Sequence, residues 1–231
     1  MGTRQIQIKT QAFIANLPMF SEMSREELDR VAAATLSVHA KKGESIFQCG
    51  DHCTGFHVVV YGQVKLAFTS PQGAEKVVEI VRPGQSFGEA LMFLDEPYIV
   101  FAQALSDCML LHIAKHAVFE ELARDPGFSR RMLSGLSRRL HGLVRDVEAY
   151  TLRSGQERVI GYLLADISDV AGNGKPLEVH LTAGKRVIAS RLNMTPEHFS
   201  RILHELVASG LIEISGRVVR IPDLERLRCG A

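Results

Sequence analysis

The chain has 231 residues, of which 46% are hydrophobic, and its 27 lysines and arginines nearly balance its 26 aspartates and glutamates. This length suits two modest domains with cores of their own, and the near balance excludes a chain that is basic throughout. The polar segment 1–13 lacks the apolar stretch of a secretory signal, and no apolar run approaches the length of a membrane span. We therefore expect a cytoplasmic protein that does not associate with a membrane.

The first part of the sequence, residues 1–125, has the pattern of a small antiparallel β-structure. Short apolar runs are separated by turns that contain glycine or proline. Val64, Leu66 and Phe68 alternate with other residues, as in a strand with one buried face. This spacing predicts a closed roll or barrel. The predicted strands are 36–39, 45–47, 55–61, 63–69, 76–81, 99–105 and 108–113.

A long helix is predicted over residues 126–152. Its apolar residues recur at alternating intervals of three and four, the heptad pattern of a helix that pairs with another helix. The alternative is that this seam packs only on the roll of its own chain. We favour pairing, which predicts a homodimer. The predicted seam is Leu133, Leu136, Leu140, Leu143, Val147 and Tyr150.

Residues 153–231 contain two helices joined by a tight turn. Asn193 tolerates the left-handed backbone that such a turn needs. Thr195 is a good N-cap for the second helix, Pro196 suits its first position, and Gly210 supplies its end. The local signals therefore predict a helix-turn-helix.

A hairpin is predicted directly after the second helix, with strands 211–214 and 217–221 around a Ser215-Gly216 turn. Between residues 184 and 221 there are six basic residues and three acidic ones. A helix-turn-helix with such a wing and an excess of positive charge predicts a protein that binds double-stranded DNA. The predicted phosphate contacts are Lys185, Arg186, Arg191, Thr195 and Arg217.

The second helix of this motif has a buried stripe and a polar face. The expected stripe is Phe199, Ile202, Leu203, Leu206 and Val207. Glu197, Ser200 and Arg201 share the opposite face, in the first turn and a half, which is the part of a recognition helix that reaches base edges. Arginine can bond guanine in bidentate fashion, glutamate can accept from the cytosine amino group, and serine can contact a neighbouring base.

Other function classes have less support in the sequence. An ordinary helix with a solvated charged face is the plain alternative for the second helix, but turn, cap and hairpin occur in register with it. The chain has no G-x-S-x-G or Walker sequence, and no histidine, carboxylate and nucleophile fall at informative spacing, so we do not expect an enzyme. A sensor module that works without DNA would have a degraded second helix, and the intact cap and polar face of this helix argue against that alternative.

The whole chain resembles the Crp/Fnr superfamily of bacterial transcription regulators. The resemblance rests on segments 42–44, 48–51, 62–65, 83–84 and 87–89, on the long helix and on the winged helix. It implies an α+β architecture with a cyclic-nucleotide-binding-like β-roll, a dimerisation helix and a DNA-binding domain, in a homodimer that acts at promoters with RNA polymerase. Glu197-x-x-Ser200-Arg201 is similar to the Fnr-type recognition signature, which implies inverted repeats of TTGAT separated by four base pairs.

The resemblance also bears on the effector. Members that bind cyclic AMP hold its phosphate with an arginine that follows a Gly-Glu pair; Gly88-Glu89 matches that pair, but segment 96–102 contains no arginine. Burying a phosphate without this cation costs several kcal/mol, which disfavours cyclic AMP. An iron–sulfur centre is disfavoured because no cysteine precedes Cys49.

Segments 87–97 and 137–141 are similar to the Dnr-type regulators of denitrification, which implies a haem-dependent response to nitric oxide, with a cyclic-nucleotide response as the alternative. The residues expected to line the effector pocket, unless they simply fill the core, are Phe87, Gly88, Glu89, Leu91, Met92, Ile99 and Val100. The candidate haem ligands are His57, His112, His116 and His141, and none is assigned because histidines usually serve other roles.

No other metal site is assigned. Cys49-x-x-His52-Cys53 has something like the spacing of metal ligands, but it lacks a second matching pair. The four cysteines are too few and too scattered for a disulfide scaffold, so we expect reduced thiols.

Overall fold

The computed structural model describes residues 10–17, 20, 23–165, 177–181 and 183–229. The chain forms two compact units, Met1–Gly73 with Val78–Gly142 and Ala74–Val77 with Leu143–Ala231. The boundary lies within the long helix α5 (Pro126–Leu152), which was predicted over the same residues. None of the helices among the described residues combines the length and the apolar character that crossing a bilayer requires.

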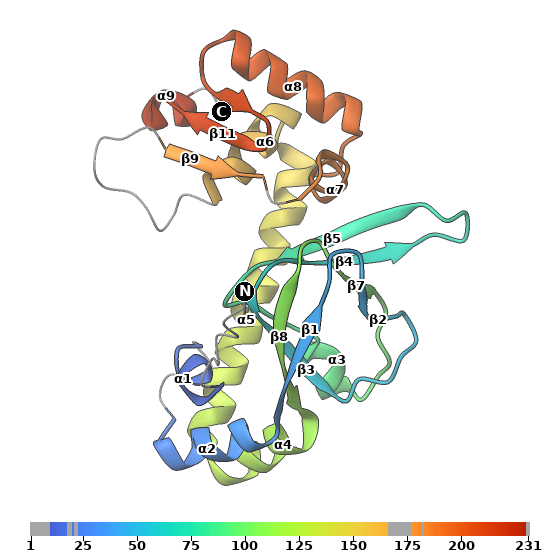
Figure 1. The fold of residues 1–231 in the computed structure, drawn as a ribbon, viewed down its shortest axis with the longest axis vertical. Coiled ribbons are helices and arrows are strands. Elements are labelled where there is room, and N and C mark those ends of the chain that lie inside the picture. The colour runs from blue at the N-terminus through green and yellow to red at the C-terminus, as the bar shows by residue number, and fades with distance from the viewer. Residues whose placement is uncertain (1–9, 18–19, 21–22, 166–176, 182, 230–231) are drawn as a thin grey trace, which may run out of the picture. The chain divides into compact units, whose positions relative to one another are not determined.

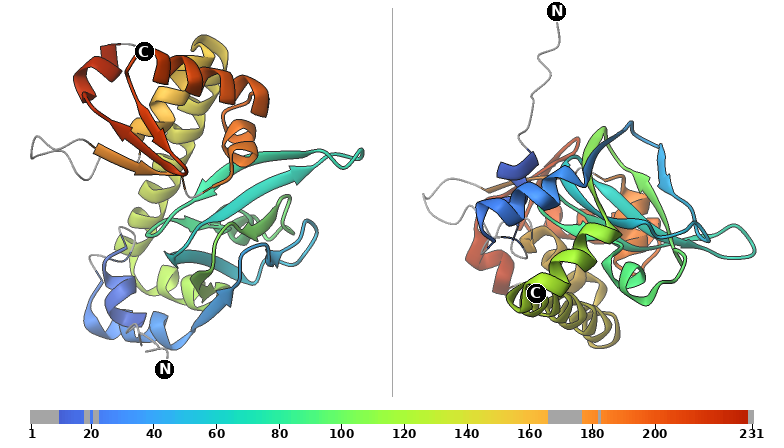
Figure 2. Two further views of the ribbon diagram at one scale, coloured as in Figure 1. Left: turned by 45° about the horizontal axis from the view of Figure 1, so that its top comes forward. Right: turned by 90° about the horizontal axis from the view of Figure 1, so that it is seen from below.

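The first unit is built on two four-stranded sheets (Figure 1). One has the strand order β1-β8-β3-β6, and the other has the order β2-β7-β4-β5. In all three views β4 and β5 run out together as a long hairpin (Figure 2). The strands are β1 (Thr35–Ala40), β2 (Ser45–Phe47), β3 (Gly55–Tyr61), β4 (Val64–Thr69), β5 (Glu75–Val81), β6 (Ser86–Phe87), β7 (Phe101–Ala104) and β8 (Cys108–Ala114).

Each of the seven predicted strands overlaps one observed strand, and the two-residue β6 was not predicted because it is too short to show an alternation. Phe68 was expected to share the buried face of β4 with Val64 and Leu66, but it is exposed. The pairing of β4 with β7 ends at Ala67, so Phe68 lies beyond the part of β4 that pairs with β7.

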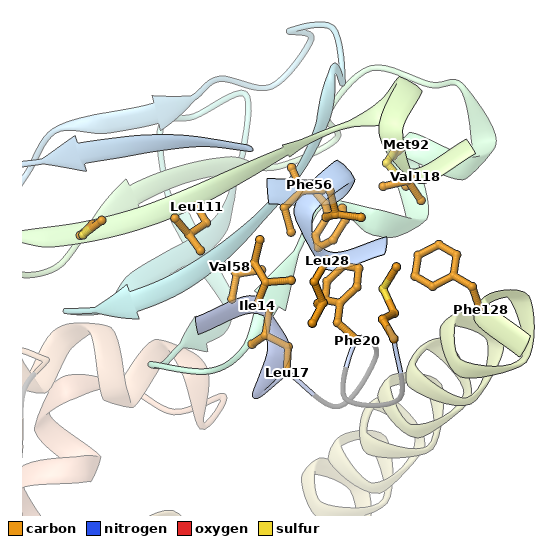
Figure 3. Close-up of a cluster of buried hydrophobic side chains, with 14 residues drawn as sticks. Ile14, Leu17, Phe20, Leu28, Phe56, Val58, Met92, Leu111, Val118 and Phe128 are labelled. Atoms are coloured by element: carbon orange, nitrogen blue, oxygen red, sulfur yellow. The ribbon is translucent and has the colours of Figure 1, made fainter. Parts of the chain in front are cut away.

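The described part of this unit also contains the first part of α5 and the helices α1 (Thr10–Ala15), α2 (Arg25–Ala33), α3 (Glu89–Leu94) and α4 (Lys115–Arg124). Alternate residues of β3 face two different apolar clusters, because successive side chains of a strand point to opposite faces. Phe56 and Val58 pack with the helices in the outer cluster (Figure 3), whereas Val59 lies in the inner cluster between the sheets. In the outer cluster the rings of Phe20 and Phe128 are 5.7 Å apart, which joins the start of α5 to the roll.

Among its described residues the second unit contains a three-stranded antiparallel sheet of order β10-β11-β9, helices α6 to α9 and the last part of α5. The fold as a whole is α+β, as the sequence predicted. Strand β9 was not predicted, because its four residues contain only two apolar side chains. The elements are α6 (Gly155–Ala165), β9 (Leu177–His180), α7 (Lys185–Arg191), α8 (Pro196–Ala208), β10 (Glu213–Ser215), β11 (Val218–Ile221) and α9 (Leu224–Cys229).

The hairpin of β10 and β11 differs from its prediction by one residue. Ser215 pairs with Val218, so the connecting loop is Gly216-Arg217 rather than Ser215-Gly216. Gly216 has φ 62°, a left-handed conformation that glycine adopts at low cost and that a two-residue hairpin loop favours. The consequence is that Arg217 lies at the tip of the wing.

Candidate functional site

Helix α8 is set in place by local signals at both ends. The backbone N–H of His198 donates to Oγ1 of Thr195 at 3.2 Å, which makes Thr195 the N-cap, and Pro196 is the first helical residue. Asn193, in the turn before it, has φ 55°, as predicted. Gly210 follows the C-cap residue Ser209 with φ 67°, so the left-handed residue that ends the helix is a glycine.

The same helix separates its apolar and polar residues by face. Phe199, Ile202, Leu203 and Leu206 are buried, whereas Val207, which was expected in the stripe, is 40% exposed. Val207 lies in the last turn of the helix, where fewer neighbours cover it.

The three predicted base-reading residues lie on the uncovered side of α8. Glu197 and Arg201 are exposed and Ser200 is half-buried. The side chain of Arg201 is 69% exposed, and its Nε is 3.8 Å from Oε1 of Glu205, a loose ion pair that costs little to open. The three side chains are therefore free to reach a major groove.

The basic residues near α8 fall into two groups. Lys185, Arg186 and Arg217 are exposed, and Thr195 is exposed with a hydroxyl hydrogen that a phosphate oxygen could accept. Arg191, by contrast, is half-buried, and its Nη2 donates to Oδ2 of Asp146 at 2.6 Å. Unlike the other predicted phosphate contacts, Arg191 is thus engaged by a carboxylate of its own chain.

Arg220 is a basic residue of the wing that is not among the predicted DNA contacts. Its guanidinium donates to Oε1 of Glu178 at 2.9 Å and lies 3.7 Å from Glu213. The hydrogen bond to Glu178 raises the pKa of Arg220. Because two carboxylates neutralise it, Arg220 is a poor phosphate contact.

The residues predicted to line the effector pocket do not all face the same space. Phe87 is buried in the inner cluster, and Leu91 and Val100 pack against that cluster. Met92 belongs to the outer cluster, and Ile99 is 55% exposed. Adjacent residues of a helix point about 100° apart, which is why Leu91 and Met92 of α3 face different clusters.

The Gly88-Glu89 pair lies at the start of α3. Gly88 has φ 97°, a left-handed conformation that favours glycine, and it lies beside the ring of Tyr98. Glu89 is buried. Tyr98 was not singled out by the sequence, yet it is buried beside this pair with its hydroxyl 3.2 Å from the carbonyl oxygen of Gly55.

Two of the four candidate haem ligands lie in the roll and touch each other. Nε2 of His57 is 3.2 Å from Nδ1 of His112, and the ring of His57 stacks on Phe87 with centroids 5.1 Å apart. Nδ1 of His57 is buried and has no hydrogen-bond partner. His116 and His141 are exposed. Among the described residues no three His, Cys, Asp or Glu side chains are grouped to hold a metal ion.

A haem does not fit this arrangement of the roll. His57 offers a neutral imidazole, the type of ligand that haem iron takes. However, the rings of Phe47 and Tyr98 stack face to face with centroids 3.6 Å apart, which leaves no slot between them. Phe47, Phe87 and Tyr98 are all buried, so a macrocycle would have to displace them.

The predicted dimer seam is largely uncovered in the single chain. Leu133, Leu140 and Val147 are each 64–65% exposed, Leu143 is 44% exposed and Leu136 is half-buried. The side chain of Tyr150 lies outside the described residues. Val144, which the heptad reading omitted, is 58% exposed one turn from Leu140. Large apolar side chains in a row on one helix are unusual for a free surface.

The three described cysteines are free thiols: Cys49 is exposed, Cys53 is half-buried and Cys108 is buried. The side chain of Cys229 lies outside the described residues. Sγ of Cys53 is 3.2 Å from the carbonyl oxygen of Gly55, so it shares this acceptor with the hydroxyl of Tyr98. Burial raises the pKa of the Cys108 thiol, so it behaves as an apolar group.

A β-roll, a long helix with an exposed apolar seam and a capped helix-turn-helix together are the parts of a DNA-binding regulator. Residues 37–125 match the cyclic nucleotide-binding domain family, and residues 157–229 match the Crp-like helix-turn-helix domain family. The chain therefore belongs to the Crp/Fnr family of DNA-binding transcription regulators.

Three relatives illustrate the range of this family. A solved structure from Ruegeria pomeroyi DSS-3, provisionally named a cyclic nucleotide-binding protein, is 30% identical, with 96% of each chain covered and a TM-score of 0.70. The DNR protein of Pseudomonas aeruginosa is 30% identical with 99% of each chain covered and a TM-score of 0.53. A CRP-like cAMP-activated global transcriptional regulator of Mycobacterium tuberculosis is 25% identical over 80% of this chain and 84% of its own.

Proposed function

We propose that the chain is a homodimeric transcription regulator that reads an inverted repeat of TTGAT with a four-base-pair spacer. The observation that carries this proposal is the exposed face of α8, on which Glu197, Ser200 and Arg201 stand within the first turn and a half. Arg201 bonds O6 and N7 of guanine, Glu197 accepts from the cytosine amino group, and Ser200 contacts a neighbouring base. Lys185, Arg186, Thr195 and Arg217 hold the phosphates and set the register.

The partner that covers the α5 seam is a second copy of the chain. A twofold dimer presents two recognition helices to two half-sites about one helical turn apart, which is what an inverted repeat requires. The exposure of Leu133, Leu140 and Val147 supports this part of the proposal, because burying such side chains contributes about 1.5–3 kcal/mol each.

The switch is allosteric. A ligand in the roll changes how the two α5 helices pack, and this changes the spacing of the two α8 helices and hence the DNA affinity. The regulator acts in the cytoplasm at promoters, with RNA polymerase as its further partner. The Dnr-like segments suggest haem and nitric oxide as the effector, which would need Phe47 and Tyr98 to move apart. Cyclic AMP is the second candidate, supported by the names of two relatives.

The composition of the inner cluster disfavours an effector that carries a phosphate group. The rings of Phe47, Phe87 and Tyr98, which are buried there, carry no charge that could pair with a cyclic phosphate. This agrees with the missing arginine in segment 96–102.

Fluorescence anisotropy tests the proposal. A labelled TTGAT-N4-ATCAA duplex is compared with one in which the half-site guanines are replaced by adenines, at one salt concentration. Four samples are measured: protein alone, with cyclic AMP, with haem, and with haem and nitric oxide. We expect a preference of about 1–3 kcal/mol per half-site in the active state. Equal affinity for both duplexes in all four samples contradicts the proposal.

A further inference from the structure

The turn that joins α7 to α8 is held by charged side chains from two other helices of the second unit. From α6, Nη1 of Arg158 donates to the carbonyl oxygen of Leu192 at 2.7 Å and to that of Asn193 at 3.2 Å. From α5, Oδ2 of Asp146 accepts from Nη2 of Arg191 at 2.6 Å. Three consecutive residues, 191–193, are thus tied down, and we call these contacts the turn clamp.

Burial and charge make these contacts stronger than ordinary surface pairs. The side chain of Arg191 is 19% exposed and that of Asp146 is 33% exposed. Hydrogen bonds between charged partners are shorter and stronger than neutral ones, and partial burial limits their screening. Leu192 is the C-cap of α7, so Arg158 also places a cation at the negative end of that helix and binds a carbonyl group near the helix end.

The clamped turn leads directly into the recognition helix. Only Met194 separates Asn193 from Thr195, the N-cap of α8. Helix α6 also packs closely on α8, because a side chain at Gly155 would meet Ile202 at 2.9 Å and His198 at 3.1 Å. Because the turn before α8 is held by hydrogen bonds and its buried face packs on α6, the orientation of α8 within the second unit is fixed.

We infer that Asp146 and Arg158 are positioning residues for DNA reading, and that Arg191 works in the turn clamp rather than as a phosphate contact. This inference rests on the proposed function, because it assigns these residues to the aim of Glu197 and Arg201. Asp146 lies between Leu143 and Val147 of the seam, so the clamp ties the helix that pairs with the second copy to the helix that reads bases.

The first experiment measures DNA binding of Asp146→Asn, Arg191→Gln, the double variant and the exchanged pair Asp146→Arg with Arg191→Asp. The preference for the TTGAT repeat over the guanine-substituted duplex should fall roughly 2- to 30-fold in each single variant. The double variant should be no worse than either single one, and the exchanged pair should recover most of the preference. Glu178→Gln, which removes a partner of the exposed Arg220, is the matched control and should leave the preference for the TTGAT repeat unchanged.

The salt dependence separates a clamp from a phosphate contact. The slope of log K against log salt should stay at the wild-type value in Arg191→Gln, whereas loss of a phosphate contact lowers it by about 0.9. A lowered slope in Arg191→Gln, with Asp146→Asn like wild type, overturns the inference. Sedimentation and thermal unfolding check that each variant remains folded and dimeric.

Amide hydrogen exchange of the free protein tests the clamp without DNA, so that a wrong operator does not hide the answer. Exchange in residues 191–199 should become faster in Asp146→Asn, Arg191→Gln and Arg158→Gln, and should be unchanged in Glu178→Gln. Unchanged exchange in all of these variants overturns the clamp. If exchange becomes faster in these variants but the wild type shows no preference for TTGAT, the turn clamp is supported and the operator of the proposed function is rejected instead.

Discussion

His57 and His112 lie directly opposite each other on the antiparallel strands β3 and β8, with Nε2 of His57 3.2 Å from Nδ1 of His112. A proton added to either ring would place a charge in the apolar interior of the roll. Burial, together with a smaller contribution from the neighbouring His112, lowers the pKa of His57 to about 3. Burial lowers the pKa of His112 as well. The pair is therefore neutral in the folded roll.

The first prediction concerns acid stability. The unfolded chain protonates His57 near pH 6.5, whereas the folded chain does so only near pH 3. The stability that this group contributes is thus present above pH 6.5 and is lost as the pH falls toward 3. The loss between pH 7 and pH 5 is about 2 kcal/mol. Urea unfolding should show a smaller loss over this range in His57→Phe, whose ring is similar in size but cannot take a proton.

His116→Gln, at an exposed histidine, serves as the control for this measurement. It should lose as much stability as the wild type between the two pH values. If His57→Phe also loses as much as the wild type, His57 does not carry the acid sensitivity.

The second prediction concerns the packing of Tyr98 in the roll. Tyr98→Phe removes the hydroxyl that donates to the carbonyl oxygen of Gly55 and should cost about 1 kcal/mol. Tyr98→Ala also removes the ring that stacks on Phe47, so the loss should be about 3–5 kcal/mol. Denaturant unfolding measures both. A cost below about 1 kcal/mol for Tyr98→Ala would mean that the ring does not fill the interior, and a haem would then have room.

The third prediction concerns the dimer. Leu140 and Val147 are exposed in the single chain, so replacing both with glutamate should leave each chain folded. In the dimer the four new charges would lie in the apolar seam and should abolish pairing and operator binding together. Arg138→Glu, an exposed charge reversal on the far side of the helix by its spacing, is the control. A double variant that remains dimeric in sedimentation would show that the seam lies elsewhere.

The fourth prediction contrasts two arginines. Arg201→Ala should cost about 1–3 kcal/mol per half-site on the TTGAT repeat and little on the guanine-substituted duplex, because it removes a base contact. Arg217→Ala, at the tip of the wing, should weaken both duplexes equally and lower the salt slope by about 0.9 for each phosphate contact. An Arg201→Ala protein that keeps the wild-type preference would remove this residue from the base-reading set.

The helix-turn-helix could be predicted because its signals are local. Thr195 caps a helix whose third residue is His198, and Asn193 and Gly210 adopt the left-handed conformations that their residue types allow. The strands of the roll were predictable from alternation and turns for the same reason. Short elements such as β6 and β9 carry too few residues to form a pattern.

The effector region could not be predicted, because it depends on contacts between distant parts of the chain. Nothing near Tyr98 in the sequence indicates that its ring stacks on Phe47. Met92 follows Leu91, yet it faces the other cluster, because the break between the clusters depends on how α3 packs on the roll. In the sequence Arg191 resembles its exposed basic neighbours, and only its contact with Asp146, on another helix, sets it apart from them.

The central claim is that two copies of this chain read TTGAT as an inverted repeat. The most direct measurement is selection of bound duplexes from a pool with a randomised central segment, followed by sequencing. Our account predicts enrichment of TTGAT-N4-ATCAA by the wild type and loss of preference at the guanine positions with Arg201→Ala. Enrichment of a repeat with another half-site, or of single half-sites without a partner, would contradict it.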